Sequence, residues 1–425
     1  MNNYNPLTAI GIPMEEVRRY EVAQDGDAVV ATAQIVPSQR VCPGCGCVGS
    51  KVKEYKTKTL KDLRTQGMRT VIELRLPRYA CPSCGKTYTH ELAIGSEGCL
   101  TGQSIASMLS DFRKALTFSE IAERHDVAVN TVISIFDEKA PNLRQPIGRG
   151  LCIDEYSNAR GSFEKYSCIL VDFETRKIVD IIKSRTKEYL RQYFFNQPKT
   201  QLSSVEFVIT DMFDGYISIA REFMPQATIA IDPFHWMEYL TEAVQNIRRD
   251  LEESAPILYD MAWMGRHWRL LTCAPENVPE GTMTLKSGMA ITWRQRVERF
   301  VKQDGDLSYA YFLLQDFYRL SRRWDKAAKR YDWITYERAR PVISRMITNM
   351  KNHGNPRLLE CGKTWEHYQE YIENSFMTID GRRLSNGPVE GINSRVKTMK
   401  KLYCGYRNKE RFAERVILIV NGRDE

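Results

Sequence analysis

The sequence lacks any apolar run that approaches the roughly 20 residues needed for a membrane-spanning helix. Its first residues, MNNYNPLTAIGIPMEEVRRY, show neither a basic start followed by an apolar core nor an arginine-rich amphipathic pattern. It also lacks a serine-nucleophile elbow, a catalytic Cys-His signature, internal repeats and low-complexity tracts. These absences argue against a membrane protein, an exported protein, a covalent hydrolase and a repeat array. We therefore expect a cytoplasmic protein with no membrane partner.

The composition indicates several packed domains. A chain of 425 residues with 43% hydrophobic content is too long for one ordinary core, and two to four domains are expected. The formal charge of +8 favours a polyanionic partner, although many basic proteins bind no nucleic acid. The eleven cysteines are odd in number and four of them form two Cys-Pro-x-Cys pairs. Reduced thiols with a metal site are therefore expected rather than a disulfide scaffold.

Residues 1–98 predict a small β-rich module built on a zinc ion, with a hairpin that turns at residues 25–27. The two cysteine pairs offer four thiolates to one tetrahedral ion, and an alternating strand at residues 72–76 could bring the pairs together. A disulfide pair or unrelated buried thiols are the alternatives, and Cys47 is close enough to compete as a ligand. Four thiolates leave no open position, so the zinc should be structural. The expected ligands are Cys42, Cys45, Cys81 and Cys84.

Residues 99–147 predict helices that end in a helix-turn-helix, with helices at residues 118–125 and 131–138. Asp126 stands where the turn usually has glycine, and aspartate tolerates the left-handed conformation. Asn130 is expected to cap the second helix and, with Thr131 and Ser134, to face a DNA major groove. Helical pairs that never touch DNA are common, and this helix has no arginine, so its base readout should be modest.

Residues 148–252 change to alternating strands and helices, as the first part of a catalytic core. Three antiparallel strands precede two helix-strand units, and this order is that of the ribonuclease H fold. Asp154 ends the first strand and Asp211 the fourth, and these strands are neighbours in that fold. A single strand-end aspartate is usually a turn or capping residue. Two on neighbouring strands indicate a cation, because adjacent buried negative charges are otherwise unfavourable.

Residues 253–384 predict a mostly helical insertion that interrupts this core. All seven tryptophans lie between Trp236 and Trp365, and core packing is their default role. The alternative is that one tryptophan, with Arg322 or Arg323 nearby, stacks on an unpaired base at a DNA end.

Residues 385–425 predict the closing helical part of the catalytic core. The apolar stripe of its first helix serves packing, and its other face carries one acid that leads a basic row. A solvated face of mixed charge is the common explanation for such a row. The functional explanation is a metal-holding carboxylate followed by DNA-contacting residues. That face carries Glu390, Asn393, Lys397 and Lys401, and the stripe Ile392, Val396, Met399 and Tyr403.

Three carboxylates far apart in the sequence could meet at one site. Asp154, Asp211 and Glu390 together could hold two divalent ions, one to activate water or a 3′ hydroxyl and one to stabilise the departing oxygen of a phosphodiester. Magnesium, or manganese, suits such oxygen ligands.

Several motifs resemble those of bacterial insertion-sequence DDE transposases of the branch labelled ISL-three. They cover nearly the whole chain and are CPGCG, CPSCG, VITDMFDGY, IDPFHW, SNGPVEGINSRVK and GYRN. The turn residue Asp126 and the extra thiol of Cys47 depart from the family pattern. The resemblance implies a metal-binding triad of Asp154, Asp211 and Glu390, with amino-terminal modules that bind terminal inverted repeats. It also implies cleavage and strand transfer into target DNA at the nucleoid by a homodimer in the synaptic complex.

Two other functions stay open at this point. A DNA-binding regulator with an inactive ribonuclease H-like domain would share the zinc and helical modules but would not need all three carboxylates. A structure-selective nuclease would cut DNA without joining it.

Overall fold

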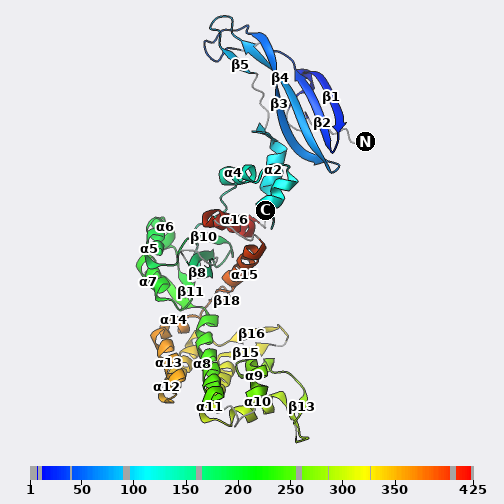
Figure 1. The fold of residues 1–425 in the computed structure, drawn as a ribbon. Helices are drawn as coiled ribbons and strands as arrows, with labels where there is room; N and C mark the ends of the chain where they lie inside the picture. Colours follow the sequence, from blue (N-terminus) through cyan, green and yellow to red (C-terminus); the bar gives the residue numbers. More distant parts are fainter. Residues whose placement is uncertain are drawn as a thin grey trace. The chain divides into compact units, whose positions relative to one another are not determined.

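The computed structural model is a mixed α/β chain, whose helices and strands are labelled in Figure 1. Its internal contacts divide it into two compact units. Unit 1 comprises residues 1–143 and 396–425, and unit 2 comprises residues 144–395. The structure describes residues 7, 12–38, 41–89, 96–158, 165–254, 261–285, 287–325, 327–402 and 408–422. Tyr403 and most of the GYRN motif lie outside these residues. No helix among the described residues is long and apolar enough to cross a membrane.

Unit 1 begins with a seven-stranded sheet in the order β1-β2-β4-β3-β7-β6, with β5 paired to β4. The predicted hairpin is confirmed, since β1 and β2 turn at Gly26, whose φ of 57° suits glycine. The predicted alternation is also confirmed. Ile72 and Leu74 are fully buried, whereas Arg75, which lies between Leu74 and Leu76, is exposed. The elements are η1 (Met14–Glu16), β1 (Val17–Asp25), β2 (Ala28–Ile35), β3 (Lys51–Thr65), β4 (Met68–Ala80), β5 (Thr87–Thr89), β6 (Ser96–Glu97) and β7 (Leu100–Thr101).

The helices of unit 1 form the predicted helix-turn-helix. Thr117 and Glu120 make a reciprocal capping box at the start of α3, which fixes where that helix begins. Asp126 adopts the predicted left-handed conformation with φ of 51°, and Lys61 of β3 donates to its backbone and carboxylate oxygens. Ala128, not Asn130, occupies the cap position of α4, so the predicted capping role of Asn130 is wrong. The helices are α2 (Gly102–Asp111), α3 (Phe118–Arg124), α4 (Val129–Lys139) and α16 (Lys409–Asn421).

The last helix, α16, belongs to this unit rather than to the catalytic core in which the sequence placed residues 385–425. Leu418 is buried in the helix-turn-helix core, and the guanidinium of Arg415 lies 5.2 to 5.8 Å from three phenylalanine rings of that core. Arg415 also donates to the carbonyl oxygens of Lys114 and Leu116. These contacts hold the fully buried side chain of Arg415, and with it α16, against the helix-turn-helix.

Unit 2 is built on a five-stranded sheet in the order β10-β9-β8-β11-β12. β8, β9 and β10 form an antiparallel meander, and β11 lies parallel to both β8 and β12. The predicted adjacency of the first and fourth strands is therefore confirmed. The strands are β8 (Gly150–Ser157), β9 (Tyr166–Asp172), β10 (Ile178–Ile182), β11 (Phe207–Thr210) and β12 (Thr228–Ile231), and the helices between or after them are α5 (Lys187–Phe195), α6 (Lys199–Ser203), α7 (Asp214–Phe223) and α8 (Pro233–Ser254).

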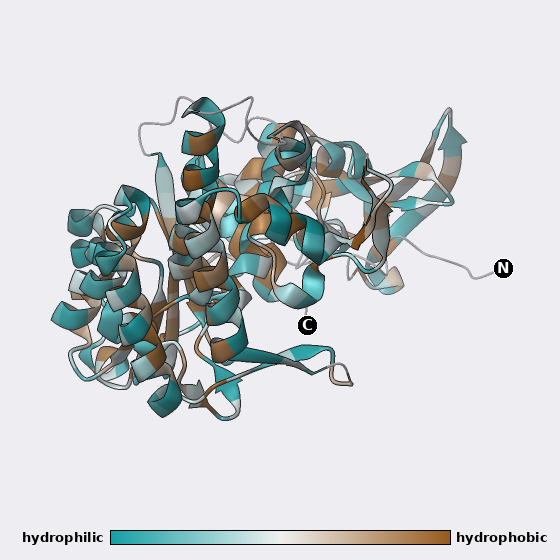
Figure 2. Cartoon of the chain, turned by 90° about the horizontal axis from the view of Figure 1, so that it is seen from below, coloured by the Kyte–Doolittle hydropathy of each residue, from teal (hydrophilic) through white to brown (hydrophobic). Residues whose placement is uncertain are grey.

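The described part of the insertion after α8 is mostly helical, as predicted, but it also contains three short hairpins. Its helices carry hydrophobic residues on one side and hydrophilic residues on the other (Figure 2). The basic run at residues 319–330 leaves α11 and forms most of the hairpin β15–β16, which the sequence did not predict. The elements are α9 (Met261–His267), η2 (Trp268–Leu271), η3 (Pro275–Asn277), β13 (Thr282–Thr284), β14 (Ala290–Thr292), α10 (Trp293–Val301), α11 (Gly305–Ser321), β15 (Arg322–Asp325), β16 (Arg330–Trp333), α12 (Tyr336–Asn352), α13 (Pro356–His367), α14 (Gln369–Asn374), β17 (Thr378–Ile379) and β18 (Arg382–Arg383), followed by α15 (Gly387–Leu402).

Core packing is confirmed for Trp236 and Trp365. Trp236 and Trp365 are fully buried, with ring centroids 5.1 Å apart, and the indole of Trp365 donates to the backbone oxygen of Trp236 at 2.9 Å. This pair ties α13 of the insertion to α8. In contrast, Trp268 and Trp324 are 41% and 37% exposed.

Candidate active site

Two aspartates meet where β8 and β11 run side by side. The parallel register pairs Ile209 with Cys152. Two residues further along, Asp211 follows the end of β11, whereas Asp154 lies inside β8 and not at its end as predicted, and the two carboxylates are close enough for Asp154 to raise the pKa of Asp211. Asp154 is only 7% exposed and Asp211 is partly buried. The sheet topology therefore joins two carboxylates that are 57 positions apart in the sequence.

The charge of this pair is poorly compensated. Burial raises the pKa of Asp154 to about 6, and the neighbouring carboxylates of Glu155 and Asp232 add to the increase. Burial also raises the pKa of Asp211 to about 7, with further repulsion from Glu155 and Asp154. The imidazole of His235 on α8 opposes both increases. A cation would offset the remaining negative charge.

Glu155 is held by other partners. Its carboxylate accepts hydrogen bonds from the guanidinium of Arg185 and, at 3.3 Å, from the hydroxyl of Tyr216. The Arg185 guanidinium itself lies 4.8 Å from the ring of Phe213. Among the described residues, Glu155 therefore has a bonded cationic partner, whereas neither aspartate has one.

Helix α15 reaches the aspartate pair through Asn393. The Asn393 amide nitrogen donates to Asp154 Oδ2 at 3.1 Å and to the Glu155 backbone oxygen at 3.2 Å. These two acceptors fix the orientation of the amide, because the opposite orientation would set its oxygen against them. The Asn393 Oδ1 atom is buried and has no hydrogen-bond partner among the described residues. The sequence predicted Asn393 as a DNA contact, whereas its amide nitrogen is engaged at the carboxylate pair.

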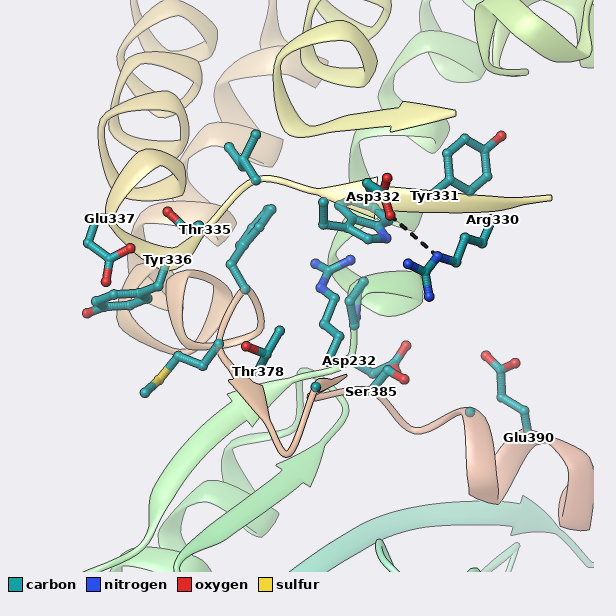
Figure 3. Close-up of a pocket in the computed structure, with 18 residues that line it drawn as sticks. Asp232, Arg330, Tyr331, Asp332, Thr335, Tyr336, Glu337, Thr378, Ser385 and Glu390 are labelled. Atoms are coloured by element: carbon teal, nitrogen blue, oxygen red, sulfur yellow. Dashed lines mark ion pairs between the residues drawn. The ribbon is translucent and has the colours of Figure 1, made fainter. Parts of the chain in front are cut away.

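Glu390 lies one turn earlier on the same helix and is exposed. Its side chain lines a cavity of about 870 Å³ with Asp232 and Ser385 (Figure 3). Among the described residues, the cysteine cluster is the one group in which three or more potential ligand atoms lie within 4.8 Å of one another. The structure thus brings Asp154 and Asp211 together but does not place Glu390 within that distance of both.

Asp232 anchors the start of this helix, a role that the sequence analysis did not identify. It is 3% exposed, and its carboxylate accepts from the backbone N–H groups of Asn386 and, at 2.8 Å, of Phe234. The Asn386 side chain donates to the Ile153 backbone oxygen at 3.3 Å. A strand-end aspartate followed by proline was the available signal in the sequence.

The four predicted zinc ligands form one cluster in unit 1. Their sulfur atoms all lie within 4.8 Å of one another, and the pairs Cys42–Cys84 and Cys45–Cys81 are each 3.6 Å apart. A tetrahedral zinc ion with bonds near 2.3 Å requires sulfur separations of about 3.8 Å. Cys47 lies outside this cluster and its thiol points to the Val48 backbone oxygen. The cluster therefore fits a structural zinc ion.

Backbone groups shape the turn at each cysteine pair and lower the pKa of two of the thiols. In each pair a glycine with φ near 70°, Gly46 or Gly85, closes a turn onto the first cysteine's carbonyl oxygen. The Gly44 N–H lowers the pKa of Cys42, and the backbone N–H groups of Cys84 and Ser83 lower the pKa of Cys81 to about 6. The thiolate form is thus favoured at Cys42 and Cys81, whereas the neighbouring Cys45 thiol and burial raise the pKa of Cys84 to about 12. Zinc binding requires thiolates, so the ion itself would have to favour the thiolate form of Cys84.

The remaining predicted DNA contacts differ in their surroundings. On α4, Asn130 and Ser134 are exposed and Thr131 is partly buried, while the opposite face packs inward. Lys397 and Lys401 are exposed on α15, and Arg323 is exposed on β15. The guanidinium of Arg322 instead lies 4.5, 4.1 and 5.3 Å from the rings of Tyr318, Tyr331 and Trp333. Arg322 therefore holds the hairpin to α11.

Comparison with known proteins identifies the family of this chain. Residues 151–416 match the ISL3 model of DDE proteins, described as a transposase. Residues 38–84 match a model described as the zinc-finger of transposase IS204/IS1001/IS1096/IS1165. The transposase for insertion sequence element IS1557 of Mycobacterium tuberculosis is 22% identical over 95% of this chain and 91% of its own length. The transposase for element IS1001 of Bordetella parapertussis is 23% identical over 93% of each chain. The chain belongs to the ISL3 family of DDE transposases, enzymes that cleave DNA and transfer its strands.

Proposed function

We propose that Asp154, Asp211 and Glu390 are the metal-binding carboxylates of this transposase, on a ribonuclease H-like core. The observation that carries the proposal is the pair of aspartates on neighbouring parallel strands, whose negative charge lacks a bonded cationic partner. Glu390 and Asn393 are three residues apart on α15, so their side chains leave one face of the helix about 5 to 6 Å apart. Because Asn393 contacts Asp154, the position of Glu390 one helical turn before Asn393 supports its assignment as the third carboxylate.

The donor set fits divalent magnesium or manganese. All the proposed ligand atoms are carboxylate oxygens, and the unpartnered Oδ1 of Asn393 is a further oxygen of the kind that hard cations accept. No thiol or imidazole is required. When bound, two such ions supply activation of the attacking water or 3′ hydroxyl and stabilisation of the departing oxygen.

Other side chains would orient this donor set. Asn393 holds the Asp154 carboxylate in one rotamer through the bond at 3.1 Å. Asp232 fixes the first turn of α15, and hence the position of Glu390, through the backbone N–H of Asn386. Arg185 neutralises Glu155, so that this acid does not compete for the ions.

The proposed substrates are the terminal inverted repeats of an insertion sequence and a target DNA, bound at the nucleoid. The zinc module and the helix-turn-helix would bind the repeats, with Asn130 and Ser134 exposed for base contact. Lys397 and Lys401 would contact the phosphate backbone. Synapsis of two ends would require a homodimer.

The test uses Glu390→Gln and Asp154→Asn in the full-length chain. Both variants should bind a DNA end as the wild type does, and both should lose nicking and strand transfer by at least about 1,000-fold, because each removes a metal ligand. Gel shift measures binding, and a plasmid carrying the element ends reports nicked and joined products. Glu188→Gln, an exposed acid on α5, is the matched control. Undiminished joining by either variant would exclude the triad.

A further inference from the structure

Strand β1 forms one end of the seven-stranded sheet in unit 1 (Figure 1). Among the residues that the structure describes, β2 is the one strand paired with β1, so the opposite edge of β1 is open to a further strand. A bulge interrupts the pairing at residues 17–19, and residues 19–25 then pair with β2 in unbroken antiparallel register. This regular stretch is as long as an ordinary strand, so it can accept a second strand along its open edge.

The core face of β1 lacks the features that usually keep an edge strand from associating. Tyr20 and Val22 lie on this face, because they are paired with Ala33 and Ala31 of β2, which are fully buried. Tyr20 packs against the core, whereas Val22 is 49% exposed. Edge strands are commonly protected by a proline or by a charge that points toward the core side. Beyond the bulge, the core face of β1 has neither, because its remaining residue there is Gln24.

The charges of the regular stretch all lie on the other face of β1 and are ordered by sign. Arg19 stands at the beginning of the stretch, Asp25 at its end and Glu21 between them. Two copies of such a strand that pair antiparallel bring the basic end of each copy against the acidic end of the other. The open edge of β1 is therefore complementary in charge to a second copy of itself.

The bulge and the charges favour one register for this pairing. Full overlap of residues 19–25 sets Val22 opposite Val22 of the second copy and Arg19 opposite its Asp25, and two-fold symmetry makes the second contact twice. Registers centred on Tyr20 or Glu21 carry the pairing across the bulge. The register centred on Glu21 also sets two carboxylates directly opposite each other, which is unfavourable. The full overlap avoids both problems and keeps the core faces of the two sheets on the same side.

We propose that β1 pairs with β1 of a second copy of this chain, antiparallel and centred on Val22, to form one continuous sheet from two zinc modules. The pairing covers the two exposed Val22 side chains with each other and forms two ion pairs between Arg19 and Asp25. These ion pairs set the register more than they add affinity. The proposed function calls for a homodimer on DNA without assigning a surface to it, whereas this association needs no DNA.

Sedimentation of the full-length, zinc-loaded chain without DNA tests this pairing, because it measures the dissociation constant of the dimer. Val22→Lys sets two ammonium groups opposite each other and should weaken the dimer at least about tenfold. Ala23→Lys is the matched control, since it adds the same charge one residue later but faces Glu21 of the second copy, so the dimer should persist. Val22 and Ala23 are both exposed, so neither change should unfold the module.

Charge reversal tests the register. Arg19→Asp and Asp25→Arg should each weaken the dimer about tenfold, and the double variant should restore it, because opposite charges then face each other again. Thermal melting of each variant separates loss of the dimer from loss of the fold. A monomeric wild type, equal weakening by Val22→Lys and Ala23→Lys, or no restoration in the double variant would overturn the proposal. Joining of an end-bearing plasmid with magnesium tests the carboxylates of unit 2 separately, so either conclusion can fail alone.

Discussion

At the scale of single residues, the active-site aspartates should destabilise the protein when no divalent ion is bound. Burial raises the pKa of Asp211 to about 7 from an ordinary value of 3.8. A raised carboxyl pKa contributes stability that is complete below about pH 4 and is lost as the pH rises through about 7. Asp211→Asn removes the charge, so this variant should be more stable than the wild type at pH 8 by about 2 to 4 kcal/mol, with a much smaller difference at pH 5.

Thermal unfolding in buffer depleted of magnesium but not of zinc measures this difference. Adding manganese should stabilise the wild type and leave Asp211→Asn unchanged, because only the wild type retains the ligand. Equal melting temperatures of the two proteins at pH 8 would show that Asp211 carries no unfavourable charge.

Substitution of Asn393 distinguishes a role of this residue at the metal site from a role in DNA contact. Asn393→Leu keeps the approximate size of the side chain but loses the hydrogen bond to Asp154 and the unpartnered Oδ1. We expect manganese affinity to fall about 10- to 100-fold, as for other residues that orient metal ligands, with end binding unchanged. Isothermal titration with manganese, on zinc-loaded protein, measures the affinity.

Lys397→Ala is the matched control on the same helix, since Lys397 is exposed four residues later. It should keep manganese affinity and reduce the salt dependence of DNA binding by about one phosphate contact. If Asn393→Leu also kept its manganese affinity and reduced the salt dependence of DNA binding, the prediction that Asn393 contacts DNA would be correct.

At the scale of elements, the two cysteine turns distinguish ligands from a bystander thiol. Cys45→Ser should lose the stoichiometric zinc and lower the melting temperature of the module, because zinc binding contributes to its folding. Cys47→Ser should retain one zinc ion per chain, because its sulfur lies outside the four-thiol cluster. Elemental analysis of the purified proteins measures the zinc content. Loss of zinc in Cys47→Ser with retention in Cys45→Ser would reverse the assignment.

Helix α16 stabilises the helix-turn-helix through a single buried arginine. Arg415→Met keeps the volume but removes the donors to the backbone oxygens of Lys114 and Leu116. We expect the free energy of unfolding to fall by about 2 to 4 kcal/mol, because each buried carbonyl oxygen left without its donor costs about 1 to 3 kcal/mol. Denaturant unfolding measures it, and the exposed Glu410→Gln serves as the control. An unchanged denaturant midpoint in Arg415→Met would mean that Arg415 does not stabilise the helix-turn-helix.

Sequence patterns predicted elements with local signals and missed those that depend on tertiary contacts. The turn at Asp126 and the alternation at Ile72 and Leu74 follow from backbone preferences and burial, and both are confirmed. The hairpin β15–β16 was missed because a basic run has no alternating apolar pattern, and its fold depends on Arg322 stacking against α11. Likewise, the Asn393 amide donates a hydrogen bond to Asp154, which lies 239 positions away in the sequence. No local rule indicates such a pairing.

At the scale of the whole molecule, unit 1 is discontinuous, since residues 1–143 fold with residues 396–425. Between these segments lies unit 2, whose main core runs from Ile147 to Phe376. A sequence-based division would place the boundary of the DNA-binding region after the helix-turn-helix and would leave α16 in the catalytic part. The buried contacts of Arg415 and Leu418 instead group α16 with the helix-turn-helix in unit 1.

This discontinuity predicts how fragments of the chain will behave. A fragment of residues 1–143 should form the zinc-bound sheet but not a stable helix-turn-helix, because the core residues around Phe112 and Phe136 lose α16 and become exposed. Its affinity for a DNA end should fall at least tenfold. Joining residues 408–425 to it through a flexible linker should restore both helical content and binding. A fragment of residues 144–402 should fold and bind manganese. Circular dichroism and gel shift measure these outcomes, and full-length affinity in the fragment of residues 1–143 would show that α16 is not part of the DNA-binding unit.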